Sequence, residues 1–276
     1  MQGTALLASF PGSHTARPPA AAPTVPAAPV FLPKEHGSWS LALEPLALGL
    51  LIAPSYAGGA LTVAVLAGFF ARRPWKALRD PGAARQRAAR ETMALFSTLG
   101  VAAFFLVLVL GGFAPLWPLL LAAPLAGLFA WFDAQNGSRA AAAEVAGSAA
   151  FALVPASLAT LAGWPAGPAL TLAVVALTRS VPTVLLVRTS LRRAKDGRGG
   201  FLLPVLTAAG AAAVLTALSV RLLLPPWAAL PAWGLLARTL WFAGPLRPAW
   251  PARRHGILEA LLGVIYVGAL ITAYRG

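Results

Sequence analysis

The stretch Pro33-Lys34-Glu35-His36-Gly37-Ser38-Trp39 marks the point at which the chain changes character. Three ionisable residues and a tryptophan stand there, directly before the apolar run from Leu41 to Ala53. Charged and amphipathic side chains can keep one end in water at the surface of a bilayer. The stretch therefore predicts a water–lipid boundary at which a membrane-embedded body begins.

The composition is that of a membrane protein with several spans. Of 276 residues, 58% are hydrophobic and 11% are charged, whereas a soluble domain carries about 25% charged residues. The absence of cysteine excludes disulfides and thiolate chemistry. The net charge of +14 does not indicate nucleic acid, because the basic residues stand mainly in loops between apolar segments. Membrane orientation and anionic headgroups explain charge of that kind.

Two regions follow from this boundary. Residues 1–32 are rich in Ala and Pro and lack the periodicity of a packed element, so we expect a disordered cytoplasmic tail. Residues 33–276 are expected to form one all-α transmembrane domain. Its apolar segments are too long and too continuous for barrel strands, and helices satisfy every backbone hydrogen bond within lipid.

We expect about nine spans, and their count depends on the division of residues 38–71 into two helices. A single helix there would break the alternation of loop charges described next. The apolar segments lie near 38–55, 57–71, 93–111, 115–132, 142–162, 167–187, 201–224, 226–245 and 256–273.

The loops alternate in charge. Those after the second, fourth, sixth and eighth segments carry Lys or Arg, and the intervening loops carry neither. The positive-inside rule then places the even-numbered loops and the N-terminus in the cytoplasm. The stretch Arg72–Asp80 in the first basic loop is interpreted as a short interfacial helix. One role for this helix is electrostatic anchoring to anionic lipid, and the other, described below, is binding of a phosphate.

Ionisable residues fall in the cytoplasmic half of five different segments. They are Glu44, Glu144, Arg179, Arg238 and Glu259. Glu44 lies eight residues beyond His36, or roughly 12 Å deep in a helix. One interpretation is structural ion pairing, of Glu44 with Arg179 or of Glu144 with Arg238. The other is a polar cavity, open to the cytoplasm, that holds a substrate by its polar end.

Two histidines begin apolar segments on the same side. His36 and His255 are each followed by glycine, and His255 shares a helix face with Glu259 at a spacing of four residues. Each histidine is either a wetted boundary residue or a titrating group at the cavity rim. No metal site is predicted, because two histidines without clustered carboxylates are a weak signal. No cofactor is identified.

Basic residues that can hold an anion complete the candidate site. Arg72, Arg73 and Lys76 in the first basic loop, with Arg179 and Arg188, are able to grip a phosphate or diphosphate. Should a reaction follow, Glu44, Glu144 or Glu259 would serve as the base, and Arg179 and Arg188 would stabilise charge. Substrate-binding candidates are His36, Arg72, Arg73, Lys76, Arg179, Arg188, Arg238 and His255.

The run 33–39, with Pro45 and Gly49 beyond it, resembles the opening of the YwiC-like family of bacterial membrane proteins. The stretches 138–147 and 179–192 are similar as well, so the resemblance covers about residues 33–273. It implies an integral membrane protein and supplies no catalytic residue.

A second resemblance concerns architecture alone. Nine helices with large basic loops after the second and sixth resemble the UbiA family of intramembrane prenyltransferases. That resemblance implies prenyl diphosphate held through Mg²⁺ on two aspartate-rich motifs in those loops. The motifs are missing here, since the loops offer only Asp80 and Asp196.

The sequence thus favours a membrane protein that binds or modifies an anionic amphipathic molecule, such as a lipid or prenyl phosphate. Its apolar part would lie among the helices, and basic residues would meet its head. Two alternatives stay open. One is a permease for a small anion or metabolite, which predicts access from both faces and often an internal repeat. The other is a non-catalytic assembly factor for a membrane complex.

Overall fold

The structure is a computed structural model that describes residues 36–79, 83–135, 137, 140–197, 199–244 and 250–275. The backbone alone is described at 36–41, 83–85, 196 and 252. The predicted tail, residues 1–32, lies outside the described residues.

Helices account for nearly all of the described chain, and the described residues contain no strand. This confirms the predicted all-α class. The helices are α1 (His36–Ile52), α2 (Tyr56–Ala77), α3 (Ala83–Gly111), α4 (Trp117–Ala134), α5 (Ala141–Ala152), α6 (Val154–Leu161), α7 (Ala166–Asp196), α8 (Leu202–Val220), α9 (Leu230–Ala243) and α10 (Ala252–Arg275). The short 3-10 helices η1 (Ala114–Leu116) and η2 (Pro226–Ala229) precede α4 and α9.

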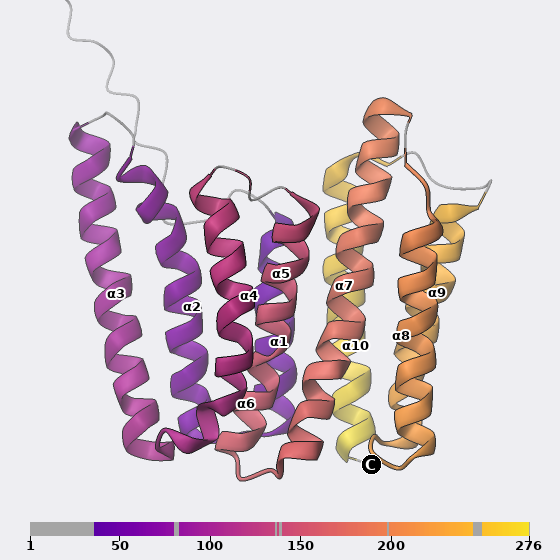
Figure 1. Cartoon of the computed structure of the whole chain (residues 1–276), viewed down its shortest axis with the longest axis horizontal. Coiled ribbons are helices and arrows are strands. Elements are labelled where there is room, and N and C mark those ends of the chain that lie inside the picture. The colour runs from indigo at the N-terminus through magenta and orange to yellow at the C-terminus, as the bar shows by residue number, and fades with distance from the viewer. Residues whose placement is uncertain are drawn as a thin grey trace, which may run out of the picture.

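The helices stand side by side in an up-and-down bundle (Figure 1). Because α5 and α6 follow one another along a single rod, the described residues form nine rods. The first and last rods, α1 and α10, pack against each other, and α7 packs against α5, α6 and α8. The C-terminal ends of α2, α4, α7 and α9 lie at one end of the bundle, and the C-terminus of the chain lies at the other (Figure 1). We call the first the basic end, because these helix ends lead into the basic loops of the sequence.

Local signals explain where several helices begin and break. The Ser55 hydroxyl accepts a hydrogen bond from Gly58 N at 2.9 Å and caps α2. This cap follows the end of α1, so the division of residues 38–71 into two helices is confirmed. Pro155 stands in the first turn of α6, where its missing N–H costs little, and it interrupts the rod at Leu153.

One local prediction is wrong. The stretch Arg72–Asp80 is not a separate interfacial helix over its described part, because α2 continues through it to Ala77 with Pro74 inside the helix. Asp80 lies outside the described residues. The continuation matters for the site, because it carries Arg72 and Lys76 on a rigid helix that reaches past the apolar segment.

Six stretches in the described residues are long and apolar enough to cross a membrane. They are Gln86–Gly111, Ala114–Ala134, Ala141–Leu161, Ala166–Lys195, Leu202–Val220 and Arg253–Arg275. The other three rods fall short for simple reasons. The apolar part of α1 and the whole of α9 are short, and basic residues end α2. The crossing of all nine rods stays a prediction.

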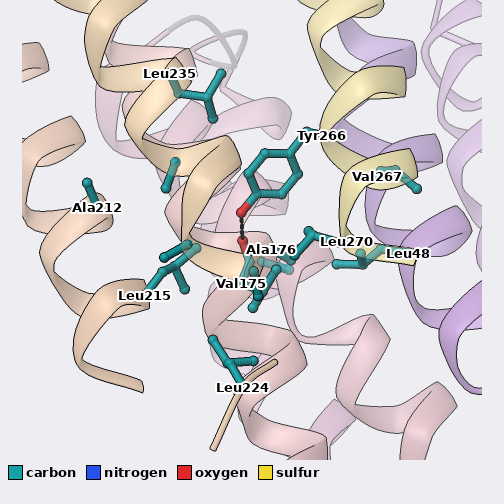
Figure 2. Packing of buried hydrophobic residues seen from close by; sticks show 14 residues of the cluster. Leu48, Val175, Ala176, Ala212, Leu215, Leu224, Leu235, Tyr266, Val267 and Leu270 are labelled. Atoms are coloured by element: carbon teal, nitrogen blue, oxygen red, sulfur yellow. Dashed lines mark hydrogen bonds between the residues drawn. The ribbon is translucent and has the colours of Figure 1, made fainter. Parts of the chain in front are cut away.

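Burial separates a lipid-facing periphery from a packed interior. In the most apolar 18-residue stretch of α3 only 11% of the residues are buried, whereas 50% are buried in the corresponding stretch of the α5–α6 rod. The largest interior cluster joins α1, α7, α8, α9 and α10 around Leu48, Val175, Leu215 and Tyr266 (Figure 2). The Tyr266 hydroxyl donates to the Val175 carbonyl at 3.0 Å, so this one polar group in the cluster is satisfied.

Candidate functional site

A buried arginine on α7 joins three helices in the interior of the bundle. Arg179 Nε lies 3.3 Å from Glu44 Oε2 on α1, and Arg179 Nη1 lies 3.2 Å from Glu259 Oε2 on α10. Arg179 Nη2 donates to the Glu259 carbonyl at 2.9 Å, and Nη1 donates to the Thr183 hydroxyl. The predicted pair of Glu44 and Arg179 is therefore confirmed.

Arg238 on α9 completes this group. Its Nη1 donates to Glu259 Oε2, so Glu259 is shared between Arg238 and Arg179. We call Glu44, Arg179, Arg238 and Glu259 the ion network. Its two carboxylates and two guanidinium groups are formally neutral together. Arg179, Arg238 and Glu259 are 3–7% exposed, so the network is buried.

The pairing of these charges lowers the need for a ligand. Isolated charges are costly in lipid, and partners from neighbouring helices reduce that cost. Four of the five ionisable residues predicted to gather do so. Because they compensate one another, their gathering alone is fully explained by helix–helix cohesion.

The donors of Arg238 are not all used. Its Nε and Nη2 are buried and have no hydrogen-bond partner among the described residues. These two nitrogens carry three N–H bonds, and all three stay hydrogen-bond donors because the guanidinium group of an arginine is not deprotonated in proteins. A buried donor left unsatisfied costs about 1–3 kcal/mol, and more in a charged group. The donors of Arg238 thus require an explanation beyond the ion network.

An aromatic layer covers the network one helical turn nearer the basic end. Phe242 lies four residues after Arg238 on α9, and His255 lies four residues before Glu259 on α10. Their ring centroids are 5.0 Å apart, and Trp250 meets them at 5.9 and 6.1 Å. His255 is 5% exposed, so it is neither a wetted boundary residue nor an open rim.

Small residues let the helices approach closely at the network. A Cβ added to Gly263 of α10 would overlap the carboxylate of Glu44, so only glycine admits that carboxylate at this position. On the other side, the Arg179 guanidinium lies 6.0 Å from the centre of the Tyr266 ring. The network is therefore closed by a tight contact between α1 and α10 and by an aromatic ring.

The fifth predicted residue pairs elsewhere. Glu144 Oε2 on α5 accepts from Arg188 Nη1 at 2.8 Å, so the predicted pairing of Glu144 with Arg238 is wrong. Arg188 is nine residues beyond Arg179 on α7, which places it about 13 Å closer to the basic end. The pair is partly open to the surroundings, with side-chain exposures of 17% and 32%.

A third charged group was not predicted. Asp133, near the end of α4, accepts from Arg72 at 2.7 and 3.1 Å and pairs with Lys76 at 2.6 Å. The Arg72 guanidinium also lies 4.9 Å from the centre of the Phe129 ring. Two of the three predicted anion-binding residues of the first basic loop are thus engaged with a carboxylate. The sequence signal for this was a lone acid beside a basic loop.

The remaining predicted residues lie apart from these groups. Arg73 is half-buried on α2. His36 begins α1, and its side chain lies outside the described residues. The structure thus brings together Glu44, Arg179, Arg238, Glu259 and His255, and it places Glu144 with Arg188 and Arg72 with Lys76.

These features define an all-α membrane protein with several apolar helices and a buried ion network between them. Residues 32–157, just under half of the chain, match the family model described as YwiC-like protein. That part of the chain is therefore similar to the YwiC-like family, as the run 33–39 predicts. The stretch 179–192 lies beyond the match, so the resemblance there stays a prediction.

No curated protein and no solved structure matches the chain, and the likeness to the UbiA family has no support from these comparisons.

Proposed function

We propose that this protein binds an anionic amphipathic molecule, such as a lipid or prenyl phosphate, between α7, α9 and α10. The basic end would face the cytoplasm of a bacterium, in whose inner membrane the protein would lie. The anionic head would take the unused N–H groups of Arg238, and the hydrocarbon part would lie among the apolar helices. The two buried nitrogens of Arg238 that lack an acceptor carry this proposal.

The chemistry of the donors supports an oxygen-rich anion. Arginine presents its N–H bonds in a planar fork that matches carboxylate and phosphate oxygens. With Nη1 on Glu259, the Nε and Nη2 edge is the free side of the fork. An anion placed there would give the group a net negative charge that the basic residues of the same end offset.

The position of Arg238 supports an amphipathic ligand. It lies five residues from the end of α9 at Ala243, or about 8 Å along the helix. One helical turn nearer the basic end, the Phe242 ring packs against the rings of Trp250 and His255. Movement of Trp250 or Phe242 would connect Arg238 with the basic end while the apolar surroundings stay in place.

The positions of the other ion pairs favour this function over a permease. In the described residues the pair of Asp133 with Arg72 lies in the last turn of α4, and the pair of Glu144 with Arg188 lies in the first turn of α5, both at the basic end. A path through the bundle would need polar groups in both halves. An assembly factor would leave Arg238 without a ligand, and the experiment below distinguishes the two.

Arg238→Lys tests the proposal without dismantling the ion network. Lysine keeps a positive charge for Glu259 and removes the fork that carries the unused donors. Binding of a single-chain alkyl phosphate would be measured by calorimetry on protein in a neutral detergent. The wild type should bind saturably. Two lost hydrogen bonds to an anion, each worth about 1.5–3 kcal/mol, should weaken binding in the variant by at least tenfold.

A matched control is Arg253→Lys, at an exposed arginine outside the network, which should leave the affinity unchanged. Unfolding midpoints of both variants should stay close to that of the wild type. Equal affinity of the wild type and Arg238→Lys for the alkyl phosphate would contradict the proposal. The unused donors would then be satisfied by water.

A further inference from the structure

A shallow groove lies on the outer face of α10, away from the ion network. It has a volume of about 260 Å³ and is lined by Trp250, Arg254, Ile257, Leu258 and Leu261. The four residues on α10 are spaced at three and four positions, so they form one stripe along the helix. His255 and Glu259, which face the ion network, lie on a different face of α10. The groove thus shares Trp250 with the aromatic layer and no residue with the ion network.

The stripe has a charged head and an apolar body. Arg254 is exposed in the first turn of α10, beside the exposed Arg253. Beyond it Ile257 and Leu261 are 52% and 58% exposed, and Val264 continues the exposed apolar face at 73%. From Arg254 to Leu261 the helix rises about 10 Å. A positive charge therefore stands at the basic end of an apolar groove that runs towards the middle of the bundle.

We infer that this groove binds one anionic phospholipid of the surrounding leaflet, with its phosphate on Arg254 and one acyl chain along Ile257 and Leu261. Charge complementarity selects the occupant, because an arginine at the level of the headgroups attracts an anionic lipid. Trp250 at the mouth is an amphipathic ring of the kind that occupies the membrane–water interface. Trp250 also belongs to the aromatic layer near Arg238, but the charge and the apolar surface of this site come from other residues than those of the proposed site at Arg238.

A site-specific readout is available because the chain contains no cysteine. Val264→Cys places a single thiol one turn beyond the groove, where a fluorescent label leaves the groove free. The labelled protein would be placed in phosphatidylcholine bilayers that contain a small share of brominated lipid. Quenching by brominated phosphatidylglycerol, relative to brominated phosphatidylcholine, gives the preference of this site for the anionic lipid.

The expected preference is about fivefold, which corresponds to ~1 kcal/mol for one basic residue near the surface. Arg254→Gln should reduce it to nearly one, while the neighbouring Arg253→Gln should retain most of it. An excess of inorganic phosphate should change nothing, because the occupant is a lipid.

The inference is overturned by a preference near one in the parent protein. It is overturned equally by the same loss in Arg253→Gln as in Arg254→Gln, which would show a diffuse surface charge rather than a site. Displacement by inorganic phosphate would assign the groove to a soluble anion.

Discussion

Replacement of Arg179 by methionine should destabilise the protein strongly. Methionine is unbranched and apolar and fills much of the same space. The substitution removes the partner of Glu44, while Glu259 keeps Arg238. It leaves two carboxylates and one guanidinium group in the ion network, so one carboxylate is buried without compensation.

The contacts of Arg179 indicate the size of the effect. Breaking a buried ion pair by removing one partner costs about 3–5 kcal/mol. Arg179 also donates to the Glu259 carbonyl and the Thr183 hydroxyl, and hydrogen bonds to charged groups contribute about 1.5–3 kcal/mol each. Since such contributions overlap, we expect a total loss of about 3–5 kcal/mol in the free energy of unfolding.

A second substitution isolates the uncompensated charge. Adding Glu44→Gln to Arg179→Met neutralises the orphaned carboxylate, so the double variant should be more stable than the single one by ~1–2 kcal/mol. The measurement is reversible unfolding in mixed micelles, followed by circular dichroism. Arg87→Gln is the control, because the Arg87–Glu91 pair is 86% and 68% exposed and should contribute less than about 0.5 kcal/mol. A loss below ~1 kcal/mol, or a double variant no more stable than the single one, would refute this reasoning.

Two further predictions follow from the fold. Gly263→Ala adds a Cβ that overlaps the Glu44 carboxylate, so it should lower the unfolding midpoint. The control Gly268→Ala on the same helix adds a Cβ that meets no atom within 4 Å, so it should leave the midpoint unchanged. Equal midpoints of the two variants would argue against the tight contact at Gly263. Single cysteines in the cysteine-free chain test its orientation: in intact cells an impermeant thiol reagent should label Tyr56→Cys and should reach Gly200→Cys, at the basic end, only after permeabilisation. The reverse pattern would contradict the predicted topology.

Much of the fold could be predicted because a lipid environment constrains each apolar segment separately, whatever its neighbours in space are. Apolar runs of sufficient length must be helical, and turn residues between them mark their ends. The division near Ser55 was visible for this reason. The end of α2 was not, because the stretch from Arg72 is polar and no local signal says that a helix continues into water. Its continuation depends on packing against α3.

The convergence of Glu44, Arg179 and Glu259 could also be predicted, because ionisable groups at similar depth seek partners. Which groups pair depends on the lateral order of the helices, which depth does not contain. Glu144 meets Arg188 because α5 packs against α7, whereas α9, which carries Arg238, packs against α8. Sequence could not assign that order, so the pairing of Glu144 with Arg238 was wrong.

The unused donors of Arg238 were beyond the reach of sequence for a related reason. Their state depends on the number of acceptors within hydrogen-bond distance, and Glu259 meets both Arg238 and Arg179 through the same oxygen, Oε2. A count of charges gives a neutral network, whereas a count of hydrogen bonds gives a surplus of donors.

In the proposed function, Arg238 holds the head of an anionic amphipathic molecule. Native mass spectrometry of gently extracted protein tests it most directly, with the wild type beside Arg238→Lys. We expect a phosphate-bearing lipid to accompany the wild type and to be lost or strongly depleted in the variant. An identical set of bound molecules in both proteins would contradict it.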